Sequence, residues 1–168
     1  MSQGIAITDL SARVVDAART SKTRLITAES CTAGALTTLL ADTPGAGDVL
    51  VGGVVTYSKS CKVDLLGIPP SLIASCSAVS AKVAAAMAQG ALDKCPSADI
   101  AIAVTCVGGP KPDDDGNPVG LAYLAVQRRG AAINVRHLLI EAQSSGRIRG
   151  DVLARALSLL LEVLTSKG

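Results

Sequence analysis

The stretch Thr27-Ala28-Glu29-Ser30-Cys31-Thr32-Ala33-Gly34 lies where a short apolar segment ends and a segment with helical spacing begins. At such a strand-to-helix junction the first backbone N–H groups of the helix lack partners, and the helix dipole favours negative charge. A phosphate or a developing oxyanion can therefore bind there. The stretch predicts an α/β fold and makes Ser30 a candidate nucleophile, provided that the rest of the chain supplies a base.

The remaining sequence alternates strand and helix patterns. We expect helices at residues 7–20, 32–41, 61–66, 80–94 and 150–165, strands at 22–27, 50–57 and 98–105, and a hairpin formed by 121–128 and 132–141. Segment 50–57 is apolar on both faces, which is typical of a central strand. The alternation predicts one α/β domain over residues 1–168, a three-layer α/β/α arrangement with a mostly parallel sheet and an antiparallel hairpin on one side.

Three of the expected strands end in polar clusters. These clusters are Glu29-Ser30-Cys31, Tyr57-Ser58-Lys59 and Thr105-Cys106. Ligands of open α/β sheets bind beyond the carboxyl ends of the strands. We therefore expect the three clusters to meet in one site.

The composition argues against several partners. The net charge is only +2, and two tyrosines are the only aromatic residues, so the chain lacks the basic surface and stacking platforms of a nucleic-acid-binding protein. No apolar run approaches the roughly 20 residues that span a bilayer. The first residues also lack the pattern of a secretory signal, so we expect a cytoplasmic protein without membrane contact.

Cysteine, histidine and aspartate do not form a metal-binding pattern. The five cysteines are widely spaced without a Cys-x-x-Cys pair, and His137 is the one histidine, so we expect neither a zinc site nor a cofactor. Most of the cysteines are interpreted as small buried thiols in a reducing compartment. Asp113-Asp114-Asp115-Gly116 lacks the alternating ligands of a calcium loop and is interpreted as a solvated loop.

The base for Ser30 is left open by the residues alone. His137 lies in a strand-like segment far along the chain and is interpreted as a strand surface residue. A desolvated lysine can accept a hydroxyl proton, and Lys59 and Lys62 follow the second strand end. A Ser–Lys pair therefore competes with the interpretation of both lysines as solvated surface residues.

Two further segments have a functional and an ordinary interpretation. Gly108-Gly109-Pro110 can form an anion-binding nest of N–H groups or a simple tight turn. Arg147 and Arg149, before the last expected helix, can bind a phosphate or lie free on the surface.

Several motifs occur together and in a specific order. They are Ala28-Glu29-Ser30-Cys31-Thr32, Gly53-Val54-Val55-Thr56-Tyr57-Ser58, Lys62, Leu65-Leu66-Gly67, Ala78-Val79-Ser80, Ala103-Val104-Thr105, Gly109-Pro110 and Pro118-Val119-Gly120. In this order the chain resembles the CinA carboxy-terminal domain family, which includes the nicotinamide-nucleotide amidases. The resemblance covers about residues 7–164. It implies an amidohydrolase that converts nicotinamide mononucleotide to nicotinate mononucleotide and ammonia without a metal.

The resemblance also implies residue roles. Ser30 matches the nucleophile of the family, Lys62 matches its lysine base, and Tyr57 matches a tyrosine near this dyad. Thr105 and the glycine-rich loop after it match the wall that holds the nucleotide. The expected substrate-binding residues are Glu29, Cys31, Thr32, Ser58, Lys59, Thr105, Cys106, Gly108, Gly109, Arg147 and Arg149.

The chain departs from the family pattern at three single residues and in one segment. Ala33 and Cys106 each stand where the family has glycine, and Lys59 stands where it has asparagine. The Gly-Asp-Arg segment of the family reads Gln143-Ser144-Ser145 here, so its arginine is replaced by a serine. Two alternatives to the amidase therefore stay open. One is a nucleotide-binding module with weakened catalysis, and the other is an adaptor protein in competence or in the DNA-damage response. We also expect the stand-alone form, because 168 residues leave no room for the amino-terminal domain of longer relatives. A homo-oligomer is expected as well, because small α/β enzymes often associate and the alanine-rich segment 80–94 offers a face for close packing.

Overall fold

The computed structural model of the chain describes residues 6–141 and 144–166. Its centre is a five-stranded sheet in the order β2-β1-β3-β4-β5. The strands are β1 (Leu25–Glu29), β2 (Leu50–Val55), β3 (Ile100–Cys106), β4 (Leu121–Arg128) and β5 (Asn134–Leu139). β1 pairs in parallel with β2 and β3, whereas β4 is antiparallel to β3 and to β5. The expected mostly parallel sheet with an antiparallel hairpin is therefore confirmed.

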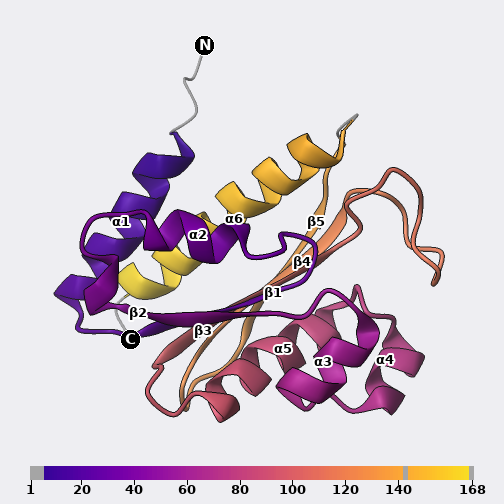
Figure 1. Cartoon of the computed structure of the whole chain (residues 1–168), viewed down its shortest axis with the longest axis horizontal. Helices are drawn as coiled ribbons and strands as arrows, with labels where there is room; N and C mark the ends of the chain where they lie inside the picture. Colours follow the sequence, from indigo (N-terminus) through magenta and orange to yellow (C-terminus); the bar gives the residue numbers. More distant parts are fainter. Residues whose placement is uncertain (1–5, 142–143, 167–168) are drawn as a thin grey trace.

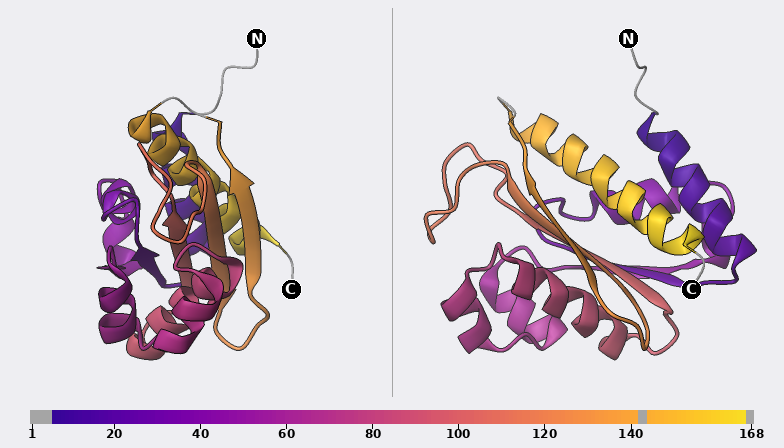
Figure 2. Two further views of the ribbon diagram at one scale, coloured as in Figure 1. Left: turned by 90° about the vertical axis from the view of Figure 1, so that its right-hand side faces the viewer. Right: turned by 180° about the vertical axis from the view of Figure 1, so that it is seen from behind.

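Helices cover both faces of the sheet (Figures 1 and 2). One face carries α1 (Ile7–Thr20), α2 (Ala35–Ala41) and α6 (Ser145–Thr165), and the other carries α3 (Lys59–Leu66), α4 (Pro70–Cys76) and α5 (Ala81–Lys94). A short 3₁₀ helix, η1 (Ala46–Asp48), precedes β2. No helix in these described ranges is long and apolar enough to cross a bilayer.

Side-chain size differs between the two sides of β3, which is buried along its whole length. Ile100, Ile102 and Val104 pack in the core shared with α1 and α6, while Ala101 and Ala103 pack against α5. Alternation along a strand sends successive side chains to opposite faces. The small residues on the α5 side let that alanine-rich helix approach the sheet closely, which explains how a chain without Phe or Trp builds two cores.

Several expected element positions were wrong. Segment 50–57 contains an edge strand rather than a central one, and all six residues of this strand are half-buried or exposed. The helix expected at 32–41 begins at Ala35, because residues 31–34 form a turn with Ala33 and Gly34 at φ of 51° and 94°. The helix expected at 150–165 begins at Ser145, and α4 was not expected at all.

The fold brings the carboxyl ends of β1, β2 and β3 to one edge of the sheet. Beyond the end of β1, the Ser30 N–H still donates to the Val104 carbonyl (3.0 Å) and the Thr56 N–H donates to the Glu29 carbonyl (2.7 Å). These bonds hold the segment after β1 between the ends of its two neighbours. The three polar clusters of the sequence consequently meet at this edge, as expected.

Candidate active site

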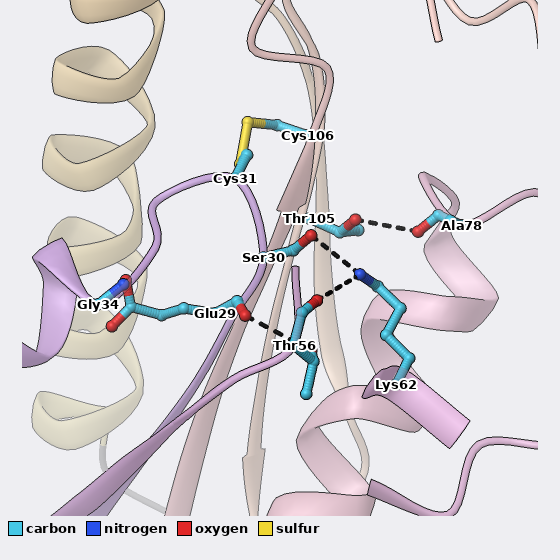
Figure 3. The surroundings of a disulfide bond; sticks show 9 residues. All are labelled: Glu29, Ser30, Cys31, Gly34, Thr56, Lys62, Ala78, Thr105 and Cys106. Carbon is cyan, nitrogen blue, oxygen red and sulfur yellow. Dashed lines mark hydrogen bonds between the residues drawn. A yellow bond between two sulfur atoms is a disulfide. The ribbon is translucent and has the colours of Figure 1, made fainter. Parts of the chain in front are cut away.

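Ser30 and Lys62 form a buried hydrogen-bonded pair at this edge (Figure 3). Lys62 Nζ lies 2.9 Å from Ser30 Oγ and 2.7 Å from the Thr56 carbonyl oxygen. The Lys62 side chain is only 1% exposed and that of Ser30 is 7% exposed. The Ser58 side chain caps α3 by accepting from the Cys61 N–H (3.1 Å), and this cap sets the start of the helix that carries Lys62.

Burial changes the protonation of Lys62. Desolvation disfavours the charged amine and lowers its pKa from 10.5 to about 8, although the nearby Cys61 opposes the shift. The neutral amine can accept the Ser30 hydroxyl proton through its lone pair while it still donates to the Thr56 carbonyl. The pair thus has the geometry and the proton affinity of a nucleophile with its general base.

Glu29 does not contact the cavity, contrary to expectation. Its carboxylate is fully buried and accepts four hydrogen bonds at the start of α2. The donors are the N–H groups of Gly34 (3.1 Å), Leu36 (3.0 Å) and Thr37 (2.8 Å) and the hydroxyl of Thr37 (2.6 Å). The helix start that the sequence offered to an external anion is therefore occupied by a carboxylate of the chain itself.

The turn between Ser30 and α2 keeps two unused N–H groups. Among the hydrogen bonds of the described residues, none uses the backbone N–H of Cys31 or of Thr32. Thr32 itself does not line the cavity, and its buried hydroxyl also lacks a partner within the described part of the chain. An oxyanion formed at Ser30 would meet these two donors rather than the first turn of α2.

A cavity of about 550 Å³ opens beside the dyad. Its lining includes the expected residues Ser30, Cys31, Tyr57, Ser58, Lys59, Lys62, Thr105, Cys106, Gly108, Gly109 and Arg149. Arg147 is not part of the lining, because it lies on a different side of the first turn of α6 than Ser145 and Arg149. A larger and more open depression, of about 820 Å³, lies at the amino ends of β1 and β2 and contains no nucleophile with a base.

The lining also contains residues that the sequence interpretation missed. They are Ala78, Val79, Val107, Lys111, Asp113, Asp114, Asp115 and Ser145. Most of them belong to the loop between β3 and β4. The glycine-rich motif predicted that this loop forms part of the site, but not which of its residues line the cavity. Gln143 of the replaced family segment lies outside the described residues.

Lys59 and Asp115 form an ion pair across the cavity mouth, with Lys59 Nζ 2.7 Å from Asp115 Oδ1. The hydrogen bond between them raises the pKa of Lys59 and lowers the pKa of Asp115, to which the Ser77 hydroxyl also donates (2.9 Å). Both side chains are partly exposed, so the pair adds little stability. It does engage Lys59, whereas Lys111 and Arg149 make no ion pair among the described residues.

The cysteines are only partly as expected. Cys31 and Cys106 form a disulfide, with their Cα atoms 5.6 Å apart, and both line the cavity (Figure 3). The other three cysteines are free and half-buried. The interpretation as reduced thiols was therefore wrong for this pair. The signal that was missed is that each cysteine directly follows a cavity residue at the end of one of two neighbouring strands.

Among the remaining candidates, His137 is a strand surface residue, as expected. His137 is exposed on β5, its ring centroid lies 5.1 Å from that of Tyr123, and it is not part of the cavity lining. Asp113 accepts from the N–H groups of Asp115 (3.0 Å) and Asn117 (2.8 Å), which closes a turn. Within residues 6–141 and 144–166 no group of three or more His, Cys, Asp or Glu side chains is placed to hold a metal.

Comparison with known proteins identifies the family. The family model described as the CinA C-terminal domain matches residues 7–164. The chain belongs to the CinA C-terminal domain family. A CinA-like protein of Mycobacterium avium is 46% identical over 124 residues, which are 74% of this chain and 27% of that relative. The CinA domain described here thus spans about a quarter of the length of this curated relative.

Solved structures show the same fold. The competence/damage inducible protein CihA from Agrobacterium tumefaciens is 31% identical, with a TM-score of 0.90, and the match covers 99% of this chain and 100% of that one. A competence-damaged protein (CinA) superfamily protein from Escherichia coli is 30% identical, with a TM-score of 0.91 and coverage of 97% and 93%. The domain of this chain therefore has the fold of these CinA-superfamily structures.

The first prediction concerns Glu29. Glu29→Gln places an amide N–H₂ among the N–H groups of Gly34 and Leu36, so hydrogen bonds to a charged acceptor are lost. We expect the free energy of unfolding to fall by about 2–3 kcal/mol in urea titrations followed by circular dichroism. Asp9→Asn, which removes an exposed carboxylate from the first turn of α1, is the matched control and should change it by less than about 0.5 kcal/mol. Equal effects of the two substitutions would contradict the capping role of Glu29.

Proposed function

We propose that this CinA domain is an amidohydrolase that converts nicotinamide mononucleotide to nicotinate mononucleotide and ammonia. The observation that carries the proposal is the buried 2.9 Å contact between Ser30 Oγ and Lys62 Nζ. A buried lysine with a lowered pKa beside a serine hydroxyl is the arrangement of an activated nucleophile with its base. Membership of the CinA family supports the choice of substrate, because the family includes nicotinamide-nucleotide amidases.

In the proposed mechanism, neutral Lys62 takes the Ser30 hydroxyl proton as the oxygen attacks the carboxamide carbon. The oxygen of the resulting tetrahedral intermediate accepts from the N–H groups of Cys31 and Thr32, which are unused within the described chain. Protonated Lys62 then gives its proton to the amide nitrogen as the C–N bond breaks, and the nitrogen leaves as ammonia. A water molecule, deprotonated by the same amine, hydrolyses the acyl-enzyme and regenerates Ser30.

The lining of the cavity suits a zwitterionic nucleotide. Lys111 and Arg149 are the unpaired cations of its described lining, and we assign them to the phosphate. Tyr57 is 72% exposed at the mouth, where its ring can cover the pyridine ring of the substrate. Lys59 is engaged by Asp115 and is assigned to the mouth of the cavity rather than to the phosphate.

The proposal predicts that Ser30→Ala stops ammonia release from nicotinamide mononucleotide. Loss of the nucleophile should lower kcat by at least about 10³-fold, because the pair acts as a unit. Coupled measurement of ammonia, with nicotinate mononucleotide followed by chromatography, reads the result. Ser75→Ala, at an exposed serine of α4, is the control and should keep full activity. Binding of the nucleotide without any product by the wild type would instead favour the non-catalytic binding module.

The rate should also depend on the protonation of Lys62. Because only the neutral amine accepts a proton, kcat/KM should rise about tenfold per pH unit below the pKa of about 8 and level off above it. Lys59→Gln should leave the midpoint of this profile in place, since the pKa of Lys59 is raised and not lowered. A profile that is flat between pH 6 and 9 would exclude Lys62 as the base.

Unfolding provides a second measure of the same group. The pKa of Lys62 is lower in the folded chain than the ordinary 10.5, so burial of the protonated amine penalises the fold below about pH 8. The penalty fades as the pH rises toward 10.5, and stability should increase over that interval. In Lys62→Met this increase should disappear.

Arg149 and Arg147 of α6 allow a test of whether the phosphate is bound by one specific arginine or only attracted by positive charge in general. Arg149→Ala should raise KM for nicotinamide mononucleotide about 10- to 100-fold, the loss expected for a charged hydrogen bond, with a smaller effect on kcat. Arg147→Ala, one half-turn away and outside the cavity lining, is the matched control. For nicotinamide riboside, which lacks the phosphate, wild type and Arg149→Ala should be equal. A KM increase of the same size in both variants would contradict the assignment.

A further inference from the structure

The disulfide between Cys31 and Cys106 lies directly beside the proposed nucleophile (Figure 3). We propose that this pair is a reversible redox site, at which a small thiol or dithiol reductant lowers turnover by releasing the turn at residues 31–34 from β3. The inference rests on the proposed amidase function for its effect on turnover, but not for its effect on the structure.

Among the described residues, the disulfide is the one covalent or hydrogen-bonded link between residues 31–34 and β3. The ladder of β1 and β3 ends with the pair Glu29 and Val104, and the N–H of Ser30 makes the last hydrogen bond between the two chain segments. Beyond that bond, Glu29 holds the turn to α2, while only the bond between Cys31 and Cys106 holds it to β3. Reduction would therefore leave one side of the turn unsupported.

The unsupported side is the one that the proposed chemistry uses. Cys31 supplies one of the two N–H groups that we assign to the oxyanion, and such donors act only when they are held in place before the reaction. Ala33 lies in the same turn with φ of 51°, in a region that residues with a Cβ atom adopt at a cost. Without the disulfide, a turn with this unfavourable backbone conformation can move more easily out of the geometry in which the N–H groups of Cys31 and Thr32 face the oxyanion.

The side chain of Cys106 adds a second effect. It lines the cavity. In the oxidised chain its sulfur is bonded to that of Cys31, on the side of Ser30 away from Lys62 in Figure 3. In the reduced chain the Cys106 thiol is no longer fixed by Cys31 and can adopt other rotamers about its Cα–Cβ bond at the cavity wall.

The redox step balances without any other group. A dithiol reductant attacks one sulfur as a thiolate, forms a mixed disulfide and releases the second cysteine as a thiol. Its own second thiol then displaces the first cysteine, so the protein gains two electrons and two protons and the reductant becomes a disulfide. Cys31 is half-exposed and lines the cavity, which gives the reductant a route to its sulfur.

The test compares oxidised and reduced protein in parallel. Alkylation after denaturation, read by intact mass, should count three free thiols before treatment with dithiothreitol and five after it. Reduction should lower kcat for nicotinamide mononucleotide about tenfold, less than the loss of a complete oxyanion donor, and reoxidation should restore it. KM should change less than twofold, because the assigned phosphate cations lie on other elements. Amide hydrogen exchange in the peptide that contains residues 31–36 should become faster.

Two variants separate the pair from the other cysteines. Cys106→Gly cannot form the disulfide. The kcat of this variant, whether high or low, should be the same with and without dithiothreitol. Cys95→Ser, at a free cysteine after α5, should keep the response. Five thiols in protein purified and oxidised without reductant would overturn the proposal, and so would a reduced enzyme with unchanged kcat and unchanged exchange.

The failure of this proposal differs from the failure of the proposed function. Protein that releases no ammonia in either redox state would overturn the amidase. In that case amide hydrogen exchange at residues 31–36 still tests the redox site independently of activity. Faster exchange after reduction supports the redox site, and equal exchange overturns it.

Discussion

The buried carboxylate of Glu29 is the interaction on which the site depends. Its four hydrogen bonds fix the start of α2, and the hydroxyl of Thr37 that donates to it also lies 2.6 Å from that of Thr27. Gly53 leaves room for these hydroxyls, because a Cβ there would collide with both. The turn after Ser30 is thus held between a strand end and a helix start, and neither could move without leaving a buried charge unpaired.

Lys62 shows how stability is exchanged for chemistry at this site. Burying the amine beside Ser30 and the Thr56 carbonyl disfavours its charged form, which costs folding free energy at neutral pH. The same desolvation lowers its pKa to about 8 and makes it a base. The cap of α3 by Ser58 and the ion pair of Lys59 and Asp115 lie at the start of the same helix. They orient the segment that must carry this unfavourable group.

Sequence patterns predicted the layers of the fold and the contact between Ser30 and Lys62 better than the other residues that line the cavity. The alternation of strand and helix patterns and the strand-to-helix junction at Ser30 can be recognised from neighbouring residues alone. The choice of Lys62 as the partner of Ser30 came from the order of the family motifs. The role of Glu29 could not be predicted in this way, because a carboxylate next to a serine is equally suited to substrate or to a helix start. The edge position of β2 depends on strand order, which an apolar segment does not encode. The pairing of Cys31 with Cys106 and of Lys59 with Asp115 depends on contacts 75 and 56 residues apart.

The mixed charges around the cavity favour a substrate that carries both signs. Asp113 and Asp114 line it together with Lys111 and Arg149, while Lys59 and Asp115 neutralise each other. Nicotinamide mononucleotide, the substrate that we propose, combines a cationic pyridinium ring with an anionic phosphate, and a lining with both signs of charge offers each end a partner. Hydrolysis of the amide adds a negative charge next to the ring. In the proposed reaction the carboxylates of the lining would repel this added charge, and the lining would then also favour release of nicotinate mononucleotide.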